Sequence, residues 1–251
     1  MLRGKFLFFG LMVCLVSAAW GGTFGKVVPI GGHASDIALD ERRGVVYLAN
    51  FTANRIEVIS ISDYSRKTPI RVPRQPGSIA LSPDARYMVV THFGKWDATF
   101  TIKPSVTILD LDTNQSRNID LGDNPLTVAF GGGSRALLVT EGTVAAAGRF
   151  LLLDPASGSL EVLAPALVGA DQLPVPFATF PPEIIKASGG VSGDNRWIIG
   201  MASAQQAEQA LTVQYRYNVQ TRQLSVIFIT SAPPLGPRVV SVNQDASMSL
   251  L

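Results

Sequence analysis

A repeated strand-turn-strand pattern constrains the fold of this 251-residue chain more than any other feature. Its clearest copy is Pro76–Val90, in which a polar turn at 82–85 separates two short apolar runs. This order is typical of two antiparallel strands joined by a tight turn. Equivalent runs open at Ala34, Pro76, Pro125, Pro182 and Pro237, with spacings of 42, 49, 57 and 55 residues. Periods of this length built from short strands favour propeller blades over helical solenoids.

Each copy contains runs for four strands. The first strands are expected at 36–39, 78–81, 127–130, 184–187 and 239–242, and the second strands at 45–49, 87–91, 136–140, 197–201 and 248–251. The third strands are expected at 56–61, 106–111, 150–153 and 212–217, and the fourth strands at 68–72, 116–121, 160–163 and 224–229. The sequence therefore predicts an all-β propeller of four-stranded antiparallel blades, incomplete, with four blades and the start of a fifth.

The N-terminus has the order of a secretory signal peptide. Arg3 and Lys5 precede the apolar run 6–16, and small residues follow at 17–19. We expect residues 1–19 to be removed, and with them Cys14, which is the chain's only cysteine. The remaining protein would then contain no disulfide and no thiolate site. The sequence predicts a secreted, periplasmic or cell-envelope protein with no membrane span after cleavage.

The propeller domain is expected over residues 26–251. Lys26–Ile30 resembles a fourth strand, which a propeller uses to complete the blade begun by the other end of the chain. The last expected strand stops at Leu251 within the fifth copy. We therefore expect the sequence to be a fragment that is truncated at its C-terminal end.

Composition limits the classes of partner. Hydrophobic residues make up 47% of the chain, enough for a sizeable core. Twenty-one basic residues face 19 acidic residues, and the difference disappears once Arg3 and Lys5 are removed. A near-neutral protein lacks the charge needed for binding nucleic acid. The expected partner is an extracellular or periplasmic protein, a glycan or a small molecule.

Several motifs resemble those of the YVTN family of β-propeller repeats. They are Tyr47-Leu48-Ala49-Asn50, the turn at 82–85 and the run Val106-Thr107-Ile108-Leu109-Asp110. The resemblance covers residues 26–164 well and weakens beyond them. It implies a secreted or cell-envelope repeat protein, often a binding module, related to lactonase-type seven-bladed propellers. These motifs are strands and turns, so they report a fold rather than an activity.

Antiparallel order places the loops before the first strands and the loops after the second strands on one face. His33 lies in one such entering loop, and Asn50, His92 and Glu141 take aligned positions at the ends of second strands. His33, His92 and Glu141 could together hold a metal ion or polarise a water, since imidazole and carboxylate are competent ligands. The alternative, which we favour, is that they cap strand ends, and no cofactor or metal is expected.

Three further residues allow two interpretations each. Trp96 and Asp97, in the longest of these loops, could form an aromatic shelf for a sugar or peptide, but packing of the loop by Trp96 is favoured. Lys186 occupies a position that holds small residues in the other copies, at Ala38, Ala80, Ala129 and Ser241. It either meets an anion in the central channel or marks an error in the alignment.

No motif indicates a catalytic centre. Gly131-Gly132-Gly133 lies in a turn with no following helix and no Lys-Ser/Thr pair, which argues against a phosphate-binding loop. The function expected is therefore a non-catalytic binding or scaffold module, with more weight against an enzyme than for one. The alternative is a lactonase-like or other hydrolase acting on a small ester or sugar lactone at the channel mouth. A third possibility is a truncated product with no function of its own.

Overall fold

A computed structural model describes residues 25–94, 103–142, 148–168, 183–206, 209–230, 241–243 and 249–250. The expected signal peptide at 1–19, together with Trp96 and Asp97, lies outside the described residues. The described part is almost entirely β-structure. It contains no helix long and apolar enough to cross a bilayer.

Four antiparallel sheets follow one another along the chain. Blade 1 contains β1 (Ala34–Asp40), β2 (Val45–Asn50), β3 (Arg55–Ser60) and β4 (Ile70–Arg71), and blade 2 contains β5 (Pro76–Leu81), β6 (Tyr87–His92), β7 (Ser105–Asp110) and β8 (Gln115–Asp120). Blade 3 contains β9 (Pro125–Phe130), β10 (Ala136–Thr140), β11 (Phe150–Leu153) and β12 (Leu160–Leu163). Blade 4 contains β14 (Glu183–Val191), β15 (Trp197–Gln206), β16 (Gln209–Asn218) and β17 (Gln223–Thr230), and β18 (Ser241–Val242) pairs with β19 (Ser249–Leu250) in a fifth sheet. The expected incomplete propeller is confirmed.

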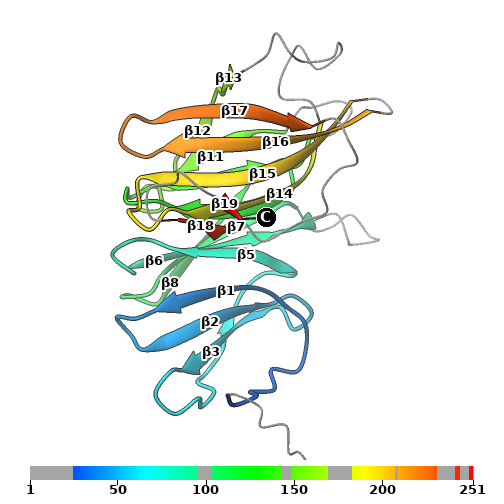
Figure 1. Ribbon diagram of the computed structural model, residues 1–251. Helices are drawn as coiled ribbons and strands as arrows, with labels where there is room; N and C mark the ends of the chain where they lie inside the picture. Colours follow the sequence, from blue (N-terminus) through cyan, green and yellow to red (C-terminus); the bar gives the residue numbers. More distant parts are fainter. Residues whose placement is uncertain are drawn as a thin grey trace, which may run out of the picture.

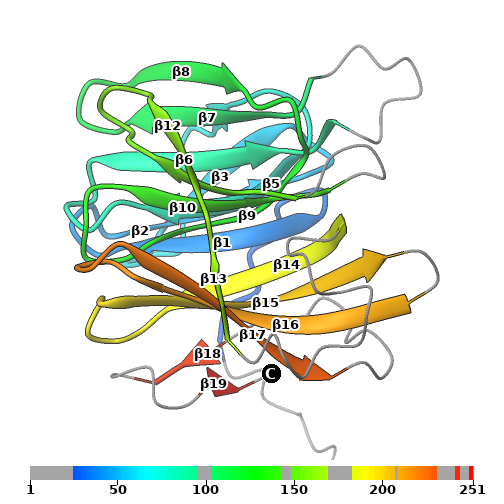
Figure 2. The ribbon, with the colours of Figure 1, turned by 90° about the horizontal axis from the view of Figure 1, so that it is seen from above.

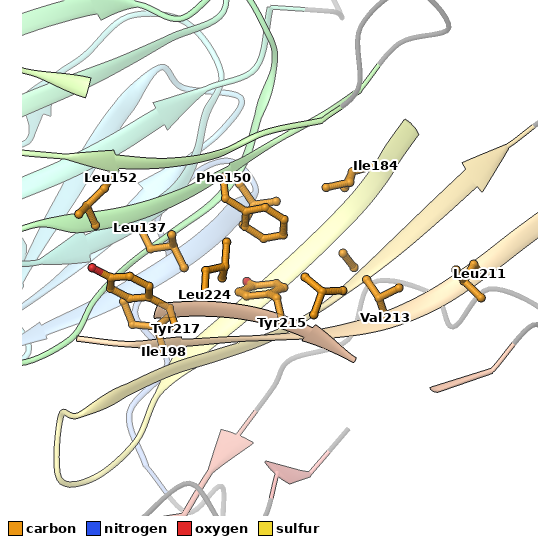
Figure 3. Close-up of a cluster of buried hydrophobic side chains, with 13 residues drawn as sticks. Leu137, Phe150, Leu152, Ile184, Ile198, Leu211, Val213, Tyr215, Tyr217 and Leu224 are labelled. Atoms are coloured by element: carbon orange, nitrogen blue, oxygen red, sulfur yellow. The ribbon is translucent and has the colours of Figure 1, made fainter. Parts of the chain in front are cut away.

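The sheets stack face to face around a common axis (Figure 1), with the first strand of each blade innermost. The inner strands lie side by side in the order β1, β5, β9, β14 and β18. Apolar side chains occupy both faces of the central strands, so consecutive blades bury apolar surface between them. Three apolar clusters result, one at each junction between consecutive blades. Figure 3 shows the cluster between blades 3 and 4, where Phe150 and Tyr215 meet edge to face.

The turn between the first two strands has the same hydrogen bonds in blades 2 and 4. In blade 2, Ser82 Oγ donates to Asp84 and accepts from the Tyr87 amide at 2.9 Å. In blade 4, Ser192 Oγ donates to Asp194 and accepts from the Trp197 amide at 3.0 Å. The two turns therefore correspond residue for residue, Ser82–Tyr87 to Ser192–Trp197.

That equivalence corrects the alignment of blade 4. Val191 pairs with Ile198 as Leu81 pairs with Met88, so the counterpart of the strand segment 78–81 is 188–191 and not 184–187. The expected strand was placed four residues early because β14 is longer at its N-terminal end and contains a bulge between Ile184 and Lys186. Gly190, a small residue, takes the place that had been given to Lys186.

Three other segments differ from expectation. The segment 202–211, between the expected second and third strands of blade 4, is itself strand on both sides of 207–208, where Ala202, Ala204, Leu211 and Val213 are buried. The chain after the expected strand 160–163 contributes a further short strand, β13 (Ala166–Val168), which pairs in parallel with β17 and forms a fifth, outer strand of blade 4 (Figure 2).

Lys26–Ile30 is not paired as a strand, contrary to expectation. Lys26 Nζ donates to the Asp63 carbonyl at 3.2 Å, and the Ile30 carbonyl accepts from Asn50 Nδ2 at 3.4 Å. The segment therefore follows blade 1 through side-chain contacts. A strand forms only when an adjacent strand offers backbone partners, and no described strand does so here.

Candidate functional site

A hollow of about 710 Å³ runs along the propeller axis. Its walls are the inner strands β1, β5, β9 and β14 of the four blades. Most lining side chains are aliphatic or small, and Asp36 is the acidic residue among them. The lining includes Phe51 and Phe93, which follow β2 and β6, and also Leu81, Phe130 and Val191 at the C-terminal ends of the inner strands.

Asn50 and His92 occupy equivalent positions at that end of their blades. Ala34 pairs with Asn50 as Pro76 pairs with His92, at the same 42-residue offset. Both side chains are fully buried. Asn50 Nδ2 donates to Glu57 Oε1 on β3 at 3.0 Å, and His92 Nε2 lies 2.8 Å from Thr107 Oγ1 on β7. Each side chain therefore links its strand end to the third strand of the same blade.

The same two side chains also hold the loop that enters the blade. His92 Nδ1 lies 3.2 Å from the Arg74 carbonyl, and Asn50 Nδ2 approaches the Ile30 carbonyl. A Cβ atom on Gly32, whose φ is +146°, would collide with Asn50 Oδ1, so glycine is required at this close approach. Asn50 and His92 therefore have a structural role, because each side chain is hydrogen-bonded to the entering loop and to the third strand of its own blade.

Burial lowers the pKa of His92 to about 4, because desolvation of the imidazolium outweighs the hydrogen bond to the Arg74 carbonyl. The ring is therefore neutral at physiological pH, with one nitrogen donating and the other accepting. A neutral histidine with both nitrogens engaged inside the protein has no free position for a substrate or metal.

Glu57 is the acidic group in this arrangement. Burial alone would raise the pKa of Glu57, but hydrogen bonds from Arg55, Asn50 and Arg66 outweigh it, so the pKa is lowered. Arg55 Nε lies 2.6 Å from Oε1 and Arg66 3.1 Å from Oε2. The carboxylate is ionised and compensated within blade 1.

Glu141 does not share the position of His92. Pro125, the counterpart of Pro76, pairs with Thr140, so Thr140 is the equivalent residue. The expected alignment was wrong by one residue because the turn from Phe130 to Ala136 is one residue shorter than the turn from Leu81 to Met88. Glu141 is nearly buried and accepts a 2.7 Å hydrogen bond from Asn124 Nδ2 in its entering loop.

His33 and Lys186 are both exposed and are not brought to a common site. The backbone of His33 is fixed by Thr52 Oγ1 and by Phe51, while its side chain is on the surface. Lys186 follows the bulge in β14 and does not line the hollow. Among the described residues, no three His, Cys, Asp or Glu side chains form a group that could hold a metal ion.

Two aromatic residues that sequence analysis passed over line the hollow. Phe51 and Phe93 immediately follow Asn50 and His92, so they are equivalent residues of neighbouring blades at the loop end of the hollow. Both are partly exposed. The signal for them in the sequence is their recurrence at the same 42-residue offset as Asn50 and His92. A pair of accessible aromatic rings beside an aliphatic wall suits an apolar or aromatic group.

The glycine-rich turn is an inter-blade contact. A Cβ atom on Gly131 would collide with Val219 of blade 4, and the Gly132 amide donates to the Asn195 carbonyl at 2.5 Å. Small residues are needed because the turns of two blades meet there. This agrees with the rejection of a phosphate-binding loop.

Comparisons with known proteins define the fold and nothing finer. No protein-family model matches the sequence, and no curated protein matches it. Hydrazine synthase from Kuenenia stuttgartiensis is similar in structure with a TM-score of 0.61 and 15% identity, covering 90% of this chain and 56% of its own. The Cps50 (Swd1) β-propeller domain from Myceliophteria thermophila gives a TM-score of 0.53 at 8% identity, covering 89% of this chain and 62% of its own.

A functionally unknown protein from Desulfotomaculum acetoxidans is similar to the same degree, with a TM-score of 0.54 and 12% identity. That match covers 88% of this chain and 63% of the other. The chain thus spans roughly three-fifths of the length of these structures. At such low identity the likeness concerns the β-propeller fold alone.

Proposed function

We propose that this protein is a non-catalytic binding module that works outside the cytoplasm and takes an apolar or aromatic group of its ligand at the mouth of the axial hollow. The observation that carries the proposal is the placement of Phe51 and Phe93, two partly exposed rings at equivalent positions beside an aliphatic wall. A protein or peptide with an aromatic side chain, or an apolar small molecule, has the matching chemistry.

The state of the polar residues supports binding over hydrolysis. Asn50 and His92 are buried and hydrogen-bonded, and Glu141 is nearly buried and bonded to Asn124. A general base must reach the proton that it removes, and these groups are instead used to hold loops. His33 is exposed, but among the described residues it does not form a group with His92 and Glu141 that could hold a metal ion.

Two sequence features support the location and the repeat type. Residues 1–19 have the order of a signal peptide, which supports export. The YVTN-like motif ends at Asn50, and its Tyr47 is buried in the junction with blade 2. A YVTN-type repeat, in which the motif residues build the core and the loops carry the site, fits this arrangement.

The test uses the fluorescent probe 1-anilinonaphthalene-8-sulfonate, which carries an aromatic apolar group. We expect saturable binding to the folded protein, with affinity reduced about tenfold in Phe51→Ala and in Phe93→Ala, as expected for the loss of one buried aromatic contact. Tyr64→Ala is the control, because Tyr64 is an accessible aromatic residue outside the hollow. Equal affinities in all variants would refute the site.

A second arm addresses catalysis. The purified protein is incubated with p-nitrophenyl acetate and with a simple sugar lactone. We expect no turnover above that of the free reagents. Turnover that disappears in His33→Ala or His92→Ala would contradict the non-catalytic proposal and favour a hydrolase.

A further inference from the structure

Each inner strand carries a polar residue at the same level of the axial hollow. Ile37 and Ile79 take the same place in blades 1 and 2, and the pairing of β9 and β14 extends this alignment to blades 3 and 4. The residues directly before these places all line the hollow, and they are Asp36, Ser78, Thr127 and Ser188. We call these four residues the polar row. Three of them carry a hydroxyl group, and Asp36 carries the charge.

The hydrogen bonds of Asp36 leave part of its carboxylate unused. Oδ2 accepts from Ser78 Oγ at 2.8 Å and from the Ile79 amide at 2.9 Å, and Oδ1 accepts from the Ile37 amide at 2.8 Å. A carboxylate offers about four acceptor positions, two on each oxygen. Within the part of the chain that the structure describes, one position on Oδ1 is therefore left for a donor from a ligand.

The charge of Asp36 has no cation beside it among the described residues. None of their ion pairs includes Asp36. None of the described residues that line the hollow is a lysine or an arginine. Glu57, in the same blade, is by contrast held by two arginines within 3.1 Å. A partly exposed carboxylate in an aliphatic hollow attracts a positively charged group and repels an anion.

Asp36 lies at the same end of the hollow as the two phenylalanines. It pairs with Ala49, two positions before Phe51, and the Phe51 amide donates to the His33 carbonyl at 2.9 Å, just before β1. Ser78 stands in the same relation to Phe93 in blade 2. Aromatic rings attract ammonium groups as well as apolar groups. The carboxylate and the rings therefore offer complementary contacts to one molecule.

We propose, as a refinement that rests on the binding function proposed above, that the ligand is a small molecule with a primary ammonium group on an aromatic body. The ammonium donates to Asp36 Oδ1, and the aromatic body lies against Phe51 and Phe93. Ser78 holds the carboxylate in place through its bond to Oδ2. An arylalkylamine belongs to this class.

The first test needs only the unmodified protein. Calorimetry compares phenethylammonium with phenethyl alcohol, which is similar in size but uncharged. We expect the ammonium to bind about tenfold more tightly, because hydrogen bonds to a charged group are the stronger ones. Equal affinities would overturn this inference and leave the aromatic site of the proposed function standing. Binding of neither probe would contradict both.

The second test removes the charge. Asp36→Asn keeps one oxygen that can accept from Ser78 and Ile79, and it should lose the preference for the ammonium while binding the alcohol as before. Asp120→Asn is the matched control, because Asp120 is an exposed carboxylate on outer strand β8 and should keep the preference. Phe51→Ala should weaken both probes. An undiminished preference in folded Asp36→Asn would overturn the inference, and if that variant does not fold, the comparison of probes decides.

Discussion

Tyr215 illustrates how single residues are fitted at a blade junction. Its side chain is fully buried, burial raises its pKa, and its hydroxyl donates to the Ser188 carbonyl at 2.8 Å. A Cβ atom on Gly200 would overlap the ring at Cζ, and a Cβ atom on Gly189 would overlap the hydroxyl oxygen. Tyr215 therefore requires glycine at position 189 in β14 and at position 200 in β15.

A double-mutant cycle tests this fit. A Cβ atom on Gly189 would strike the Tyr215 hydroxyl, whereas the next ring atom is 3.4 Å away, an ordinary contact. Gly189→Ala should lower the free energy of unfolding by about 1 to 3 kcal/mol, the usual cost of overpacking. In a Tyr215→Phe background the same substitution should cost less than about 1 kcal/mol, since the overlapping atom is gone. Chemical denaturation measures all four proteins, and an equal cost in both backgrounds would contradict the explanation.

His92 should make stability depend on pH. Its pKa is lowered to about 4 in the folded protein and returns to an ordinary value near 6.5 on unfolding. The unfolded chain therefore binds the proton first, and stability is lost as the pH falls from 6.5 toward 4. The loss attributable to His92 is roughly 3 kcal/mol.

The measurement is urea denaturation at pH 7 and pH 4. His92→Gln, whose side chain stays neutral, should show a smaller decrease than the wild type by that amount. The chain's only other histidine, His33, is exposed, so His33→Gln should reproduce the wild-type decrease. A decrease in His92→Gln as large as that of the wild type would show that the imidazole is not responsible.

At the scale of elements, the turns carry most of the local information. Ala85 in blade 2 and Asn195 in blade 4 occupy the same place in the repeated turn, with φ of 54° and 60°. Asparagine tolerates this left-handed conformation, whereas alanine is strained in it. The turn forms in blade 2 because serine and aspartate side chains bind the backbone around it.

Ala85→Gly should therefore stabilise the protein. Glycine removes the strain of the left-handed conformation from the folded state, and this gain in free energy exceeds the cost of the greater conformational entropy of the unfolded chain. We expect the free energy of unfolding to rise by about 0.5 to 1 kcal/mol. Asn195→Gly, at the equivalent position, should give a smaller gain. Thermal denaturation distinguishes the two, and a loss of stability in Ala85→Gly would disprove the assignment of strain.

Turn chemistry also explains which strands were predictable. β10, β11 and β12 have the expected bounds of 136–140, 150–153 and 160–163, because short apolar runs end at turn residues. β14, β15 and β16 are longer than expected, because their extensions are held by pairing with one another rather than by local sequence. A one-residue difference in a turn displaced Glu141 from the position assigned to it.

The whole molecule depends on links between blades. Asp36 of blade 1 accepts hydrogen bonds from Ser78 Oγ at 2.8 Å and from the Ile79 amide at 2.9 Å, both in blade 2. Beside it, Ser35 Oγ donates to the Pro76 carbonyl at 2.7 Å. Because each blade contacts only its neighbours, the loss of one link should be felt most at that junction.

Asp36→Ala should lower the free energy of unfolding by about 2 kcal/mol, since it removes the acceptor of the Ser78 hydroxyl and the Ile79 amide in blade 2 and of the Ile37 amide in its own strand. Hydrogen exchange measured by mass spectrometry should accelerate in blade 1 and in β5, with blade 4 unaffected. Asp84→Ala is the comparison, because Asp84 accepts from Ser82 and Arg86 within one turn of blade 2. Uniform acceleration over all blades in Asp36→Ala would show that the sheets unfold only as one unit.

The sequence alone determined that this chain forms consecutive four-stranded blades, because alternating apolar residues and turn residues act over a few positions. It also placed Asn50 and His92 correctly at equivalent strand ends. Only the tertiary structure decided that both side chains are buried and hydrogen-bonded to neighbouring loops and strands. It also decided that Phe51 and Phe93 line the hollow and that Ile37 and Leu39 remain exposed. Those outcomes depend on which sheet lies against each strand, and contacts between blades join residues 40 or more positions apart, beyond the reach of a local pattern.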